Sequence, residues 1–289
     1  MRIVIGNKLT SLIFRAICTV VLLALFPISA STIKVITFNI RYDSGRDGVN
    51  SWQNRKGLLL KFLIDQDADI ICLQEVLHHQ YTHLKDRMES YGVVGNGRND
   101  GQTKGEYAPI FYKNSKYDLL DNGMFWLSEN PNKVGSIGWD AKQPRIATWA
   151  KLIEKEGGKS FIVINTHFDD IGRVARQKST DLIMEWISRF DAPTILTGDF
   201  NDDSRSALYE KLSNNTSGLQ DAHVFAKDRL GVNYTFHGFG RTSNEHRTKI
   251  DYIFVKGVNE LKSEEIIEEN SEVGAFLSDH NPIIVVMSL

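Results

Sequence analysis

The chain has 289 residues, of which 42% are hydrophobic and 24% charged, so it can bury a large core and is neither disordered nor fibrous. Its formal net charge is −2, and without residues 1–30 it would carry 31 Lys+Arg against 36 Asp+Glu, about −5. This balance argues against broad, non-specific affinity for DNA, which depends on basic patches. It does not exclude one local basic patch on the surface.

The N-terminal segment has the pattern of a cleaved secretory signal. Three basic residues (Arg2, Lys8 and Arg15) precede the apolar run 16–28, and small residues follow at 29–31. The run is shorter than the roughly 20 residues of a membrane span, although an uncleaved anchor that extends it upstream is the alternative. We therefore predict a signal peptide at 1–30, a mature domain at 31–289, a secreted or periplasmic location and no stable membrane insertion after cleavage.

Apolar runs of strand length recur along the mature chain, rich in Val, Ile, Phe and Tyr and flanked by Gly, Asn and Asp. In chain order they predict strands at 33–40, 70–73, 91–95, 107–112, 147–153, 161–165, 194–196, 249–255 and 283–287. Helical periodicity predicts helices at 54–66, 78–90, 174–189 and 204–211. The Gly157-Gly158 pair predicts a hairpin turn within 154–160. We expect one domain in which sheets pack face to face with helices outside.

Polar residues of a few types recur where these runs begin or end. In TGDFND (197–202), Asp199 and Asn201 share one face of a strand because successive side chains alternate. The same pattern places Asn39, Glu75, His167, Asp251, Asp279 and His280 at or near strand ends. Each residue alone is explained by a turn, a helix terminus or a satisfied core histidine. Together they favour a hard divalent cation such as Mg²⁺ or Mn²⁺ and phosphoryl chemistry, and no Cys pair or HExxH spacing suggests zinc.

The ordered motifs FNIRYD, LQE, GEYAPIFYK, NTHFDD, GDFND, IDYIFV and SDH resemble the endonuclease/exonuclease/phosphatase superfamily. Its members include deoxyribonuclease-like nucleases, apurinic endonucleases, deadenylases, inositol polyphosphate 5-phosphatases and neutral sphingomyelinases. The resemblance covers Lys34 to Met287, and RYDSGRDGVNSWQNRK and GWDAKQPRIATWAK look closest to secreted bacterial members. It implies a four-layered α/β sandwich, with two mixed, mostly antiparallel sheets face to face, helices outside and the site at one rim.

The resemblance also implies metal ligands. Glu75 would be the principal ligand of Mg²⁺ or Mn²⁺, with Asn39 beside it. Asp279 would be a ligand of a second metal, if there is one.

The catalytic roles that the resemblance implies fall on the remaining strand-end residues. Asp199 would orient or deprotonate the attacking water, and Asn201 would hold the nucleophile or a phosphate oxygen. His167 and His280 would stabilise a phosphorane-like transition state. Asp251 would hold the His280 ring through a hydrogen bond.

Three further residues are candidates for substrate binding. Arg145, in QPRIATW, matches a phosphate-contacting Arg of family nucleases, and Tyr107 would line the cleft unless it packs in the core. Arg41 stands where apurinic endonucleases carry an acid. It would bind a second phosphate or pair near Glu75, and it weakens an assignment as a repair nuclease.

We therefore expect a secreted, metal-dependent hydrolase that cleaves phosphodiester or phosphomonoester bonds by attack of an activated water. The partner would be a phosphate-ester substrate: a small molecule, a lipid head group or a nucleic acid. The acidic balance and Arg41 favour a small or lipid-derived substrate. The alternatives are an endonuclease or exonuclease acting on DNA or RNA, and a non-catalytic binding protein on the same fold. We expect a monomer.

Overall fold

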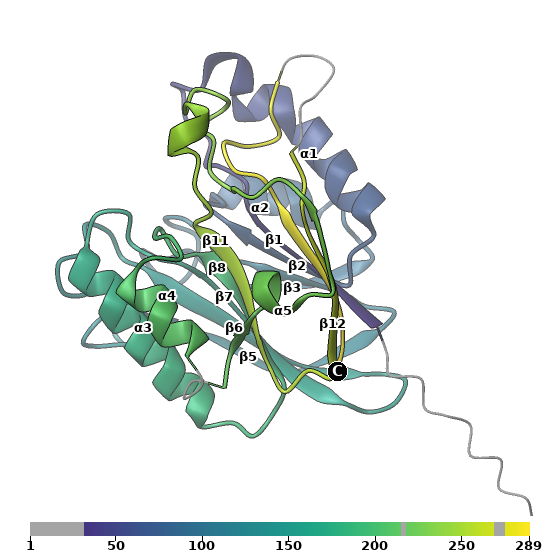
Figure 1. Cartoon of the computed structure of the whole chain (residues 1–289). Helices are drawn as coiled ribbons and strands as arrows, with labels where there is room; N and C mark the ends of the chain where they lie inside the picture. The colour runs from purple at the N-terminus through teal and green to yellow at the C-terminus, as the bar shows by residue number, and fades with distance from the viewer. Residues whose placement is uncertain (1–31, 215–217, 269–274) are drawn as a thin grey trace, which may run out of the picture.

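A computed structural model describes residues 32–214, 218–268 and 275–289, and the predicted signal peptide, 1–30, lies outside the described residues. The described chain forms two sheets that face each other, with helices on both outer sides (Figure 1). Helices α1 (Trp52–Gln66) and α2 (His78–Lys85) cover one sheet, and α3 (Arg173–Ser188) and α4 (Ala207–Ser213) cover the other. The four-layered α/β sandwich is therefore confirmed.

The first sheet runs in the order β10 (Asp228–Gly231), β12 (Glu260–Ile266), β13 (Ile283–Ser288), β1 (Thr32–Asn39), β2 (Ile70–Gln74), β4 (Ile110–Lys113), β3 (Tyr91–Val94). The second runs β5 (Tyr117–Trp126), β6 (Ile146–Glu154), β7 (Ser160–His167), β8 (Thr194–Asp199), β11 (Asp251–Lys256), β9 (Gln220–Asp221). Only the pairs β1–β2, β7–β8 and β10–β12 are parallel among the described strands. The sheets are mixed and mostly antiparallel, as expected.

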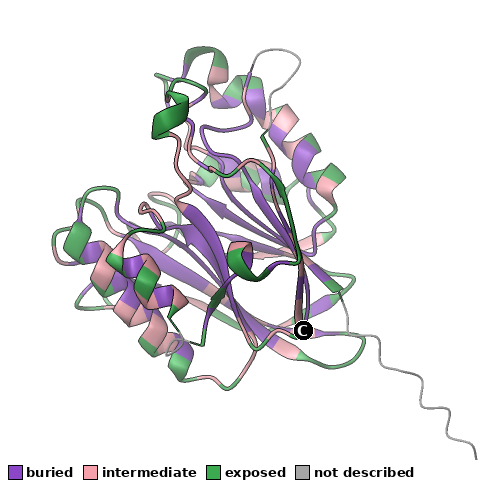
Figure 2. Cartoon of the chain, in the orientation of Figure 1, coloured by how far each residue is buried: buried purple, intermediate pink, exposed green. Residues whose placement is uncertain are grey.

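Strand alternation sorts the apolar side chains into layers. In β1, Val35 packs between the sheets, whereas Ile36 and Phe38 pack against α1. In β7, Val163 faces the space between the sheets and Ile164 faces α3. Both faces of these strands are thus apolar, which is why the strands read as continuous hydrophobic runs. Figure 2 shows the strands almost wholly buried and the helices exposed on their outer sides.

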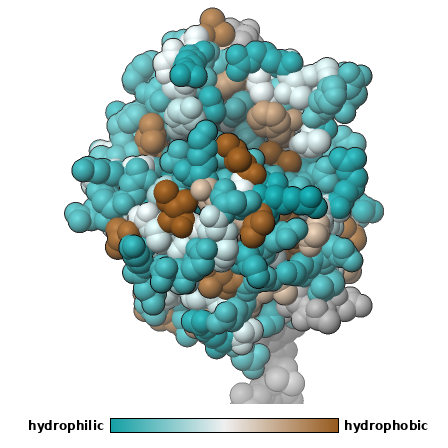
Figure 3. Space-filling view, turned by 90° about the vertical axis from the view of Figure 1, so that its left-hand side faces the viewer, coloured by the Kyte–Doolittle hydropathy of each residue, from teal (hydrophilic) through white to brown (hydrophobic). Residues whose placement is uncertain are grey.

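None of the helices in the described part of the chain is long and apolar enough to cross a bilayer. The face in Figure 3 is mainly hydrophilic, with apolar side chains in small separate groups. Scattered apolar side chains of this kind are normal on a protein surface.

All of the predicted strands and helices are present, with shifted bounds. The largest shifts are the strand predicted at 107–112, which starts at Ile110, and the helix predicted at 78–90, which ends at Lys85. The short helix α5 (Ala222–Phe225) and the strands β5, β9, β10 and β12 were not predicted from the sequence. Strand β5 includes the polar and Gly stretch DNG, and β12 is rich in Glu and Lys, so neither reads as an apolar run.

The sheet topology brings the polar strand ends to one rim. Parallel pairing aligns the C-terminal ends of β7 and β8, where His167 stands beside Asp199. Asp251 begins the antiparallel strand β11 opposite Asp199. Between the sheets and below this rim, Gln74 Nε2 of β2 donates to Asn165 Oδ1 of β7 at 2.6 Å. This buried hydrogen bond ties the two sheets together directly beneath the site.

Candidate active site

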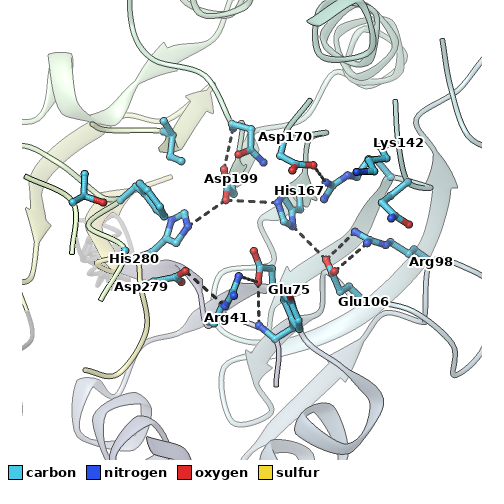
Figure 4. Close-up of a pocket in the computed structure, with 18 of the residues that line it drawn as sticks. Arg41, Glu75, Arg98, Glu106, Lys142, His167, Asp170, Asp199, Asp279 and His280 are labelled. Carbon is cyan, nitrogen blue, oxygen red and sulfur yellow. Dashed lines mark hydrogen bonds and ion pairs between the residues drawn. The ribbon is translucent and has the colours of Figure 1, made fainter. Parts of the chain in front are cut away.

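An open cleft of about 740 Å³ lies at this rim. Figure 4 shows acidic, basic and imidazole side chains that converge on it from both sheets. The cleft is lined by the predicted residues Arg41, Glu75, Arg145, His167, Asp199, Asn201, Asp279 and His280, whereas Asn39, Asp251 and Tyr107 do not line it.

Unusual backbone conformations shape the cleft floor. Arg41, Glu75 and Asn201 have positive φ angles of 57°, 60° and 51°. Such conformations cost on the order of 1 kcal/mol or more for residues other than Gly and concentrate at functional sites. Gly198 is required for a different reason, because a Cβ there would lie 2.3 Å from the Thr166 carbonyl oxygen of the adjacent strand. In TGDFND, the Gly thus permits the close strand contact that brings Asp199 to the rim.

Asp199 is the centre of the cluster. Its Oδ1 accepts a hydrogen bond of 2.9 Å from the Asn201 backbone, and its Oδ2 accepts one of 2.9 Å from Asn39 Nδ2. The Nε2 atoms of His167 and His280 each lie 3.7 Å from the same Oδ2. Two imidazoles therefore flank one buried carboxylate.

His280 is held from behind by Asp251. Its Nδ1 lies 2.8 Å from Asp251 Oδ2, and both side chains are buried. Burial opposes the charged ring, but the negative charges of Asp251 and Asp199 raise the pKa of His280 to about 10. These charges favour the protonated ring, and the His280 side chain lines the cleft.

Glu106, for which the sequence predicts no role, lies behind His167. The Glu106 carboxylate makes two hydrogen bonds with Arg98, at 2.8 and 3.0 Å, and its Oε2 lies 3.6 Å from His167 Nδ1. Burial opposes ionisation of Glu106, but His167 and Arg98 lower its pKa to about 2. Each imidazole thus has an acid behind it. The signal for Glu106 was its place in GEYAPIFYK, but no apolar run precedes it.

Glu75 and its neighbours suit a divalent cation. Glu75 Oε2 accepts a hydrogen bond of 3.0 Å from the Tyr42 backbone. Burial and the charges of Glu106 and Asp279 raise the pKa of Glu75, so its ionised form is favoured by positive charge, part of which Arg41 NH1 supplies from 3.8 Å. A hard cation with oxygen ligands would add to that charge. This set of acids fits a divalent cation.

Asn39 is placed as a support for the acids. Its Nδ2 donates to Glu75 Oε1 at 3.1 Å as well as to Asp199, and its Oδ1 accepts from the Arg41 backbone N–H at 3.0 Å. Because a backbone N–H can only donate, this contact fixes the amide with its oxygen away from Glu75. Asn39 therefore aligns the two carboxylates, and the structure does not present its oxygen as a ligand.

A second group of acids and imidazole has metal-like spacing. Ligand atoms of Asp199, Asp251 and His280 lie within 4.8 Å of one another. The Asp251–His280 hydrogen bond already uses one ligand atom of each residue. The Glu75 carboxylate makes no such pairing with an imidazole and is the other candidate position for a cation.

The predicted substrate-binding residues are placed differently from one another. Arg145 lines the cleft and is oriented by Asp169 at 3.2 Å and Asp170 at 2.8 Å. Tyr107 is buried, with its ring stacked 4.8 Å from that of Tyr81 and its hydroxyl bonded to the Gln102 carbonyl at 2.9 Å. The structure therefore corrects the placement of Tyr107, which belongs to the core beneath α2. Arg41 lines the cleft and forms ion pairs with Asp47, Glu75 and Asp279.

Comparison with known proteins gives consistent similarities. The model of the endonuclease/exonuclease/phosphatase family matches residues 36–280. A crystal structure described as the endonuclease/exonuclease/phosphatase from Bacteroides vulgatus is 46% identical, with a TM-score of 0.86 over 90% of this chain and 99% of that one. The mannosyl-6-phosphatase Bt3783 of Bacteroides thetaiotaomicron is 33% identical, with a TM-score of 0.83 over 89% of this chain and 100% of that one.

Curated relatives are more distant. The uncharacterized protein L388 of Acanthamoeba polyphaga mimivirus is 27% identical over 88% of this chain and 99% of its own length. The Ccr4 3'-5'-exoribonuclease subunit of Mycosarcoma maydis is 24% identical over 71% of this chain, and the match spans 36% of that protein.

Proposed function

The chain belongs to the endonuclease/exonuclease/phosphatase family, and we propose that it is a Mg²⁺- or Mn²⁺-dependent hydrolase of phosphoesters. One observation carries the proposal. Asp199 Oδ2 lies 3.7 Å from the Nε2 atoms of both His167 and His280, in the cleft that Glu75 lines. This arrangement offers a base for water and two N–H donors for a phosphoryl group.

In the proposed mechanism, Asp199 orients the attacking water and accepts its proton. Asn201 Nδ2 donates to the Phe168 carbonyl at 2.9 Å, which turns the Asn201 carbonyl oxygen toward other donors such as the water. The His280 imidazolium donates to a non-bridging phosphate oxygen. His167 donates to another, with its ring held by Glu106.

A divalent cation held by Glu75 would supply charge neutralisation at the phosphate and the leaving oxygen. We propose that Glu75 is its principal ligand. Asn39 holds the carboxylate of Glu75 in position for that role through the 3.1 Å hydrogen bond.

We favour a small phosphomonoester as the substrate. Support comes from the 33% identity to a mannosyl-6-phosphatase over that protein's full length. The cleft also holds several arginines among its acids, which suits a compact dianion.

A nuclease is the second candidate. The match to an exoribonuclease subunit supports it, as do two positively charged side chains that line the cleft, Lys142 and Arg241. Lys142 and Arg241 line the cleft and form no ion pair with any described residue, so they could contact a polynucleotide backbone. A comparison of kcat/KM for a hexose 6-phosphate, bis-p-nitrophenyl phosphate and single-stranded RNA separates these classes. We expect the sugar phosphate to be preferred, and a preference for RNA of tenfold or more would favour the nuclease.

We also propose that the mature enzyme is a monomer that begins near Ser31 outside the cytoplasm. The basic and apolar pattern of residues 1–30 supports export. N-terminal sequencing of secreted or periplasmic material tests the site of cleavage, and recovery of an intact Met1 in cytosolic protein would contradict it.

A further inference from the structure

Arg41 lies between Glu75, the proposed metal ligand, and Asp279, the acid that the family resemblance gives to a second metal ion. Its NH1 lies 3.8 Å from Glu75 Oε2, and its Nε lies 3.8 Å from Asp279 Oδ2 (Figure 4). The same Nε lies 3.3 Å from Asp47 Oδ2. One guanidinium therefore contacts three carboxylates at the edge of the cleft.

The backbone of Arg41 is held by contacts that do not involve its guanidinium. The Arg41 carbonyl accepts hydrogen bonds from Arg55 NH2 at 2.6 Å and Gln80 Nε2 at 3.0 Å. The guanidinium carbon lies 4.3 Å from the centre of the Tyr42 ring. Because the backbone is held independently, loss of the side chain should leave the surrounding loop in place.

The charge of Arg41 is permanent. A second divalent cation between Glu75 and Asp279 would have to displace this charge or lie against it. Either event is unfavourable, because like charges repel and a guanidinium cannot lose its proton at ordinary pH.

We propose that Arg41 is a tethered cation in the place of a second metal ion, and that it limits the site to one divalent cation per chain. Asp279 is then a partner of Arg41 and not a metal ligand. The inference rests on the proposed metal dependence, but it concerns only the number of ions that bind.

The test is the stoichiometry of Mn²⁺ binding to metal-stripped protein, measured by titration calorimetry and by electron paramagnetic resonance of free Mn²⁺. Arg41→Gly removes the charge, tolerates the positive φ of 57° and adds no ligand. Arg41→Lys keeps the charge. Arg46→Gly is the matched control, because Arg46 is exposed in the same loop and forms no ion pair with any described residue. Circular dichroism checks that each variant is folded, and Arg41→Gln is the second neutral variant if Arg41→Gly is not.

We expect one Mn²⁺ per chain in the wild type, Arg41→Lys and Arg46→Gly, and two in Arg41→Gly. Asp279→Asn added to Arg41→Gly should restore one. Two ions in the wild type, or one ion in the folded neutral variant, would overturn the inference while leaving metal dependence intact. No binding to any variant would overturn the proposed function as well.

Discussion

Replacement of His280 by Ala and of Asp251 by Asn, singly and together, tests whether the two residues act as one unit. The ring nitrogen and the carboxylate oxygen are 2.8 Å apart, and the side chains are 5% and 1% exposed. Breaking a buried ion pair from one side costs about 3–5 kcal/mol. If about 3 kcal/mol of this is lost in the transition state, kcat falls by on the order of 10², since 1.36 kcal/mol is tenfold.

The assay is kcat and KM for both single variants and the double variant. We expect each single change to lower kcat by on the order of 10² or more with a smaller change in KM, because the pair acts mainly on transition-state charge. The double variant should lose little more than either single variant, since each change disables the same unit.

Asp221→Asn is the matched control. Asp221 is also a buried acid, on the strand next to β11, but its partners are the Tyr209 hydroxyl at 2.7 Å and the His223 backbone at 2.9 Å. We expect this variant to lower Tm and leave kcat nearly unchanged. Two outcomes would refute the claim that Asp251 and His280 act as one unit. One is a double variant whose loss of kcat is the product of the two single losses, and the other is an Asp251→Asn variant that behaves like Asp221→Asn.

Four further outcomes are expected. Glu75→Gln should abolish divalent binding in calorimetry and leave the protein folded, and an unchanged affinity would remove Glu75 as a ligand. Glu106→Gln should lower kcat by about tenfold or more with little change in Mn²⁺ affinity, because it frees the His167 ring. The pKa of His280 is about 10 in the folded protein against an ordinary 6.5, so protonation of its ring stabilises the folded state. This contribution to the free energy of unfolding is complete below pH 6.5 and is lost as the pH rises through 10. Chemical unfolding across that range measures the loss, and kcat should decline over the same upper limb. Tyr107→Phe should lower Tm but not change KM, because the hydroxyl bonds to the Gln102 carbonyl and His78 Nδ1, which do not line the cleft.

The rim of polar residues could be predicted because each residue follows or begins an apolar run. Asp199 and His167 end buried strands, and Asp251 begins one. Side chains at such positions must find partners, so their types alone indicate a shared site. The sandwich was predictable for the same reason, because strands buried on both faces are apolar throughout.

Other features depend on distances across the fold. Glu106 follows a loop, and only the folded chain brings it within 3.6 Å of His167. The orientation of the Asn39 amide depends on the backbone of Arg41, and Tyr107 lies in the core because its ring meets Tyr81 of α2. Strands β5 and β12 carry polar and charged residues, so hydrophobic periodicity does not mark them.

The most direct test of metal-dependent hydrolysis is the fate of solvent oxygen. Metal-stripped enzyme is incubated with a hexose 6-phosphate in ¹⁸O-labelled water, with Mg²⁺ or Mn²⁺ restored or with EDTA, and the released phosphate is examined by mass spectrometry. Attack of an activated water at phosphorus predicts one ¹⁸O in each phosphate, release only when a cation is present, and loss of release in Asp199→Asn. Release without a cation, or phosphate without the label, would contradict the mechanism.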